Sequence, residues 1–126
     1  MRFSVLIATA LLAGGCARPI APSGSTLAAE TAGRAAGPPQ SCISSSPQEG
    51  LRVLDAATLA YGHGRTIYVN SLGGACPGLE PTATLIVEPG LGGQYCRGDR
   101  VRGREVGAII SGPTCLLGDW VPYRKP

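Results

Sequence analysis

Short runs of apolar and β-branched residues, separated by turns rich in glycine and proline, recur from residue 51 to the end of the chain. Runs of this kind, bounded by Gly, Pro, Asn or Asp, are typical of β-strands. The strands that the pattern predicts lie at residues 51–54, 58–61, 66–70, 82–88, 100–102, 106–110 and 119–123. The glycine-containing loop at 62–65 predicts a hairpin. Pro122 favours an edge position for the last strand, because proline cannot donate a ladder hydrogen bond.

No stretch after residue 42 shows the period of an amphipathic helix. Short strands with regularly spaced turns are typical of small antiparallel sheets and barrels. We therefore expect an all-β domain over residues 42–126, with a small antiparallel sheet or open barrel of about 5–7 short strands.

The hydrophobic pattern at the N-terminus has a different meaning. An apolar run follows Arg2 and ends in the small residues 13–15, directly before Cys16. The run is shorter than the roughly 20 residues that span a bilayer, and small residues before a cysteine indicate a lipoprotein signal peptide. We expect residues 1–15 to be removed and Cys16 to carry the lipid (diacylglyceryl and an acyl chain such as palmitate). An ordinary secretory signal with an incidental cysteine is the alternative.

The residues between the lipidation site and the domain are dominated by Ala, Pro, Gly, Ser and Thr, without an apolar period. This composition predicts a flexible tether over residues 16–41. A short helical turn around residues 27–30 fits the sequence but would bury nothing. By resemblance to other bacterial lipoproteins, Ala17 lacks the aspartate-type signal for inner-membrane retention, which implies the periplasmic face of the outer membrane.

Once Cys16 carries lipid, four of the five cysteines remain, and an even number in an exported chain predicts two disulfides. Sequence alone allows three pairings. We favour Cys76–Cys96, which brackets the strand at 82–88, and Cys42–Cys115, which ties the start of the domain to its end. A domain this small has a core that rarely contributes more than about 3–5 kcal/mol, so it needs such cross-links. Zinc or dithiol chemistry would require a Cys-x-x-Cys spacing, which is absent.

The net charge and the absence of catalytic motifs exclude several classes of function. Removal of residues 1–15 leaves ten basic and eight acidic residues, a net charge of about +2 that is too small to indicate nucleic-acid binding. A local cluster of basic residues predicts either an anion-binding patch or the solvated face of a strand; its members are Arg97, Arg100, Arg102 and Arg104. The only histidine, His63, lies between two glycines at the expected hairpin tip. We find no paired carboxylates, no Gly-x-Ser-x-Gly elbow and no metal or cofactor motif, so we expect no enzyme.

Several short elements occur in a recognisable order: Cys-Ile at 42–43, Arg-Val-Leu-Asp at 52–55, Cys-Pro-Gly-Leu at 76–79, Tyr-Cys-Arg-Gly-Asp at 95–99 and Cys-Leu-Leu-Gly at 115–118. This order resembles an uncharacterised proteobacterial family of small exported proteins and lipoproteins, defined as a domain of unknown function. The resemblance covers residues 42–123. It implies export and four structural cysteines, and it assigns no activity, ligand or site.

The predicted function is therefore a non-enzymatic binding or structural module of the bacterial envelope, held at the membrane through Cys16. A partner would be an envelope protein or, if tyrosines and the arginine cluster share an exposed face, a glycan. One alternative is a periplasmic inhibitor of lysozyme or protease, with a rigid loop stapled by Cys76 or Cys115. A redox or thiol enzyme is the other alternative, and it would require a free reactive cysteine.

Overall fold

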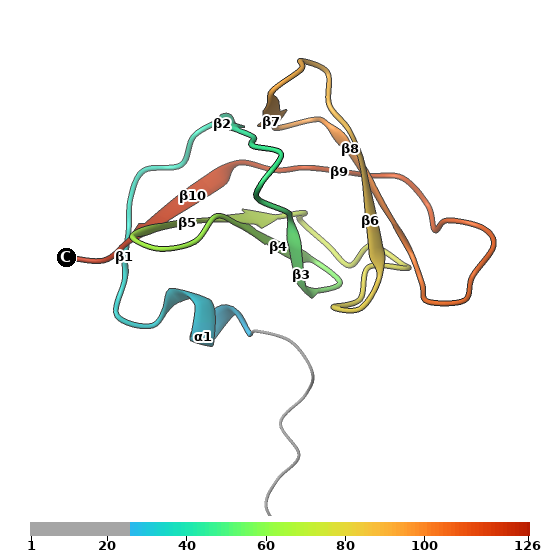
Figure 1. Ribbon diagram of the computed structural model, residues 1–126, viewed down its shortest axis with the longest axis horizontal. Coiled ribbons are helices and arrows are strands. Elements are labelled where there is room, and N and C mark those ends of the chain that lie inside the picture. The colour runs from blue at the N-terminus through green and yellow to red at the C-terminus, as the bar shows by residue number, and fades with distance from the viewer. Residues whose placement is uncertain (1–25) are drawn as a thin grey trace, which may run out of the picture.

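The computed structural model describes residues 26–126, whose strands form three small antiparallel sheets (Figure 1). The largest sheet has the order β1-β10-β5-β4-β3, the second β6-β8-β9 and the third β2-β7. The strands are β1 (Ala35–Ala36), β2 (Cys42–Ser44), β3 (Arg52–Asp55), β4 (Thr58–Tyr61), β5 (Thr66–Ser71), β6 (Thr84–Glu88), β7 (Gln94–Cys96), β8 (Arg100–Arg104), β9 (Cys115–Leu116) and β10 (Trp120–Arg124). One short helix, α1 (Leu27–Thr31), precedes them.

The all-β prediction is confirmed. Within residues 26–126, six strands are at least four residues long, and each overlaps a predicted run. The predicted hairpin is the β4–β5 pair, in which Tyr61 lies opposite Tyr68. The remaining strands have only two or three residues, which is too short for a pattern of alternation to show in the sequence.

Two strand predictions were wrong. Residues 106–110 form a loop, because Gly107 has a positive φ of 81° and the Ala108 N–H donates to the Glu105 carbonyl in a turn. β10 is not an edge strand, because β1 pairs with it. The Pro122 carbonyl accepts a hydrogen bond from the Gly37 N–H on that side, so the missing prolyl N–H also faces the two-residue β1.

Residues 35–41 belong to the domain rather than to the predicted tether. β1 pairs with the end of β10, and the backbones of Gln40 and Trp120 exchange two hydrogen bonds. The expected helical turn exists as α1 and buries none of its own residues. The signal sequence and Cys16 lie outside the described residues.

The main core combines side chains of the largest sheet with side chains of β2, β8 and the connecting loops. Trp120, Leu59 and Val101 are completely buried there. A second, smaller cluster of buried apolar side chains lies on the same sheet, apart from the main core, and includes Ile67 and Val69 of β5. The buried Asn70 side chain donates to the Gly118 carbonyl and accepts from its N–H, which fixes the turn before β10.

The four cysteines of the domain form two disulfides, as expected, but the favoured pairing was wrong. The bonds are Cys42–Cys96 and Cys76–Cys115. β2 and β7 pair so that Cys42 lies directly opposite Cys96. Cys76 is 1% exposed and bonds to β9. The strand pairing therefore decides the connectivity, and nothing in the cysteine spacing reports it.

Candidate functional site

The most developed cavity is a groove of about 650 Å³ between β3 and β6. β3 is one of the two edge strands of the largest sheet, and β6 is one of the two edge strands of the second sheet. The groove thus lies where the sheets leave two strand edges without a partner strand among the described residues. Its lining is mostly apolar and consists of Ser45, Gly50, Leu51, Arg52, Val53, Leu54, Pro81, Ala83, Leu85, Val87, Pro89 and Tyr95.

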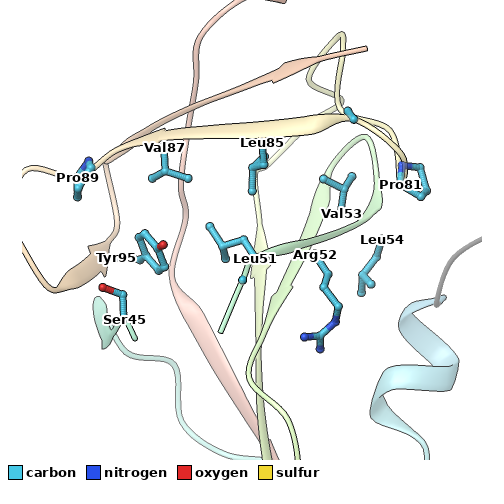
Figure 2. Close-up of a pocket in the computed structure, with 12 residues that line it drawn as sticks. Ser45, Leu51, Arg52, Val53, Leu54, Pro81, Leu85, Val87, Pro89 and Tyr95 are labelled. Atoms are coloured by element: carbon cyan, nitrogen blue, oxygen red, sulfur yellow. The ribbon is translucent and has the colours of Figure 1, made fainter. Parts of the chain in front are cut away.

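Strand alternation explains the apolar walls of the groove. Leu85 and Val87 are two residues apart on β6 and therefore share one face. They point toward Leu51 and Val53, which rise from the opposite wall (Figure 2). Val53 is nearly buried in the main core, whereas Leu51, Leu85 and Val87 pack against that core and stay partly exposed, so these three side chains are the central contact surface of the groove.

An aromatic pair supports one end of the groove. The ring of Tyr95 lies edge-on to that of Tyr61, with 5.7 Å between the ring centroids. The Tyr61 hydroxyl accepts a hydrogen bond of 2.7 Å from the Ser46 N–H, which fixes the loop that carries Ser45. Burial raises the pKa of the Tyr61 phenol above its ordinary value of 10.0, so the phenol is neutral at physiological pH. Tyr61 is therefore a structural support.

The opposite end of the groove carries its only charged side chain, Arg52. Its guanidinium contacts α1, where Nε and Nη2 each donate to a carboxylate oxygen of Glu30 at 3.1 Å. This bidentate ion pair attaches α1 to β3 and balances the charge of Arg52. The groove therefore offers apolar contact and strand edges without a free charge.

The residues considered for catalysis are not brought together. His63 is exposed in the turn between β4 and β5, away from the groove lining. All four cysteines of the described chain are in disulfides. Residues 26–126 contain no group of three or more His, Cys, Asp or Glu side chains that could hold a metal ion.

Three of the four arginines of the predicted cluster lie in a row on β8, and the fourth, Arg97, lies apart from them. Val101 and Gly103 are buried, so the residues that alternate with them, Arg100, Arg102 and Arg104, share the outer face of β8. Arg97 lies in the preceding turn and pairs with Asp119 at 3.3 Å.

Within the row, only Arg102 has an ion pair with a described residue. Its partner is Glu88 of β6, at 3.3 Å. The strand register places Ile86 opposite Arg102 and Leu116 opposite Arg100, so these apolar side chains share the outer face. We call Ile86, Glu88, Arg100, Arg102, Arg104 and Leu116 the arginine face.

The aromatic residues of the described part of the chain are not members of the arginine face. The tyrosines and the tryptophan lie on other strands: Tyr61 on β4, Tyr68 on β5, Tyr95 on β7, and Trp120 and Tyr123 on β10. None of these five residues lies on β8, which carries the row of three arginines.

The groove is not evident from the sequence. Its walls carry a readable signal, since Leu51 with Val53 and Leu85 with Val87 both show the two-residue apolar spacing of a strand face. The sequence does not report that both strands end their sheets, because that depends on which distant strands pair.

No protein-family model, curated protein or solved structure matches this chain. The resemblance to the exported proteobacterial family therefore stays a prediction. In residues 26–126, no helix has the length and apolar character needed to cross a membrane.

Proposed function

We propose that this protein is a non-enzymatic binding module of the bacterial envelope, anchored through Cys16 at the periplasmic face of the outer membrane. We further propose that the groove between β3 and β6 holds an extended, apolar segment of a partner protein. The observation that carries this proposal is an apolar groove bordered by two strand edges that lack partner strands among the described residues.

The size and lining of the groove suit binding better than catalysis. Its volume of about 650 Å³ lies within the range of small-ligand sites. Among its lining residues there is no carboxylate, imidazole or thiol, and Arg52 is paired with Glu30. Such a site offers contact area to an apolar ligand but no group of the kind that usually serves as a general acid or base.

The strand edges favour an extended peptide over a compact ligand. An edge strand presents unpaired N–H and C=O groups that can accept another strand, while alternate side chains of the peptide fill apolar pockets. β6 is the more regular edge, since all five of its residues pair with β8 without a register shift, whereas β3 has an irregularity between Val53 and Asp55. We therefore expect the partner segment to pair with β6.

The envelope location rests on the lipoprotein signal and is supported by the two disulfides. Disulfides persist in oxidising compartments such as the periplasm. A domain of this size has a small core, and its strands form three separate sheets, so cross-links supply stability that the core alone does not.

Site-specific photocrosslinking in intact cells tests the proposal. The photoreactive residue p-benzoylphenylalanine replaces Pro81, an exposed residue at the groove rim, in the full chain. The matched control position is Lys125, which is exposed and does not line the groove. We expect a discrete adduct from Pro81 only, whose mass-spectrometric map is a short extended segment of an envelope protein.

A groove-filling variant makes this experiment decisive. Ala83→Trp places a large side chain among the lining residues, so it is expected to abolish the Pro81 adduct and the binding of a synthetic peptide that copies the mapped segment. The proposal fails if no adduct forms, if Lys125 gives the same adduct, or if the adduct persists with Ala83→Trp.

A further inference from the structure

The β8–β9 loop, residues 105–114, exposes apolar side chains to an unusual degree. The exposed fractions of Val106, Ile109 and Ile110 are 80%, 95% and 83%. The loop projects beyond the sheets and is seen in orange and red at the right of Figure 1. Apolar residues that gather on an exposed surface mark an interaction site in a natural domain.

The base of the loop is held in place. The Gly112 N–H donates to the Gly103 carbonyl at 2.7 Å, and the disulfide Cys76–Cys115 follows directly after the loop. A Cβ on Gly112 would lie 2.5 Å from the Pro77 carbonyl oxygen, so only glycine fits there. The apolar tip is therefore presented on a fixed base, which lowers the entropy cost of binding.

The loop continues directly from the arginine face. Arg104 is the last residue of β8, and Arg100 and Arg104 have no ion pair with a described residue. Leu116, 57% exposed, lies opposite Arg100 on the same face. Two carboxylates, Glu88 and Glu105, lie beside three arginines, so the surface keeps a positive balance next to its apolar tip.

We propose that the β8–β9 loop and the arginine face dock on an anionic phospholipid surface. The side chains of Val106, Ile109 and Ile110 enter the boundary between headgroups and acyl chains, and Arg100 and Arg104 bind lipid phosphates. This combination of exposed aliphatic groups beside cationic ones is the chemistry of interfacial membrane binding. The proposal uses no residue of the groove, so it stands or fails independently of the proposed function.

The chemistry of the loop favours a lipid over a protein partner. Protein–protein contacts concentrate their binding energy in aromatic and arginine anchors that fill pockets. The loop residues 105–114 contain no aromatic residue, and aliphatic side chains on a projecting tip need only a fluid apolar phase. Charge complementarity supports the same choice, because the planar guanidinium group binds phosphate through two hydrogen bonds.

Tryptophan fluorescence locates the contact in the full chain, in which Cys16→Ser removes the proposed lipid anchor so that vesicle binding depends on the domain itself. Ile109→Trp introduces a reporter at the tip, while the natural Trp120 is fully buried and contributes a constant background. The matched control is Leu91→Trp, in the β6–β7 loop, where the native side chain is 63% exposed. Vesicles contain phosphatidylcholine with phosphatidylglycerol, brominated in the acyl chains, or brominated phosphatidylcholine alone.

We expect a blue shift and quenching of the Ile109→Trp emission by the anionic vesicles and neither effect for Leu91→Trp. Adding Arg100→Gln and Arg104→Gln to Ile109→Trp is expected to weaken vesicle binding roughly fivefold for each arginine removed. The proposal is overturned if Ile109→Trp is quenched no more than Leu91→Trp, which would leave a protein partner as the occupant. Equal quenching by phosphatidylcholine alone would overturn the role of the arginines.

Discussion

The groove and the β8–β9 loop present similar aliphatic side chains in opposite ways. In the groove, Leu85 and Val87 are half-buried and point toward the wall formed by β3. In the loop, the side chains of Ile109 and Ile110 are 95% and 83% exposed. The groove therefore suits a ligand that enters between its two walls. The loop, in contrast, is suited to insert its own side chains into an apolar lipid layer.

The two regions also differ in whether their arginine side chains are paired with carboxylates. Arg52 at the groove is bound by Glu30 through two hydrogen bonds, while Arg100 and Arg104 beside the loop have no ion pair with a described residue. A neutralised charge next to an apolar groove adds little to the attraction of a charged ligand. Unpaired arginines beside an apolar tip add attraction for phosphate. Composition alone would not separate the regions, since both combine aliphatic residues with arginine.

The largest expected effects come from removing the disulfides, one of which supports each region. Cys42→Ser with Cys96→Ser opens a link across 54 residues, and Cys76→Ser with Cys115→Ser opens one across 39. Each pair is expected to lower the free energy of unfolding by about 4 kcal/mol, because the unfolded chain gains entropy. Urea denaturation of the full chain measures both values.

The two pairs are also expected to separate the functions. The bond between β2 and β7 supports the Tyr95 end of the groove, so its loss reduces crosslinking from Pro81 more than vesicle quenching at the loop. The bond to β9 supports the base of the loop, so its loss has the reverse effect. Equal loss of both signals in both pairs would contradict the independence of the two regions.

A smaller effect is expected from Tyr61→Phe, which removes the hydroxyl that accepts from the Ser46 N–H. The loss is expected to cost about 1 kcal/mol near neutral pH. Because the folded-state pKa of Tyr61 is raised above 10.0, the stability from the neutral phenol is complete below pH 10 and is lost as the pH rises through the folded-state pKa. Thermal unfolding between neutral pH and pH 11 measures this change.

The pH dependence of the stability difference between the parent protein and Tyr61→Phe tests whether burial of the phenol contributes to stability. The parent protein is expected to lose stability above pH 10 more steeply than Tyr61→Phe, so the gap between them narrows. Tyr68→Phe is the control, because the Tyr68 hydroxyl has no hydrogen bond to a described residue. A gap between the parent and Tyr61→Phe that stays constant across this range would show that burial of the phenol contributes nothing.

The smallest effect is expected from Ile109→Ser with Ile110→Ser. Both side chains are already in water, so the free energy of unfolding should change by no more than about 0.5 kcal/mol. The matched groove substitution Val53→Ser, at a position 7% exposed, is expected to cost about 1–3 kcal/mol. Chemical denaturation compares them directly. A large loss of stability from the loop variant would show that the loop packs on the domain.

Local patterns in the sequence predicted the strands that alternate clearly. The hairpin at β4 and β5 followed from two short runs of strand-favouring residues on both sides of a glycine turn. The same reasoning failed at residues 106–110, where Gly107 adopts a positive φ and the chain has no strand to pair with. It also missed β1, since two alanines carry no alternation.

The candidate sites depended on pairing that the sequence does not report. The disulfide connectivity follows from the pairing of β2 with β7, which are separated by most of the domain. The groove exists because β3 and β6 each end a sheet. The arginine cluster was visible as a cluster, but only the alternation along β8 separates the row of three from Arg97.

Hydrogen–deuterium exchange along β6 tests the central claim, that this edge receives a partner strand, most directly. The full chain is compared alone and with the peptide that copies the crosslinked segment. We predict that alternate amides among residues 84–88 exchange rapidly in the free protein and slowly in the complex, and that Ala83→Trp removes the difference. Unchanged exchange in β6 while the peptide is bound would contradict the account, because the peptide would then bind without pairing with the strand.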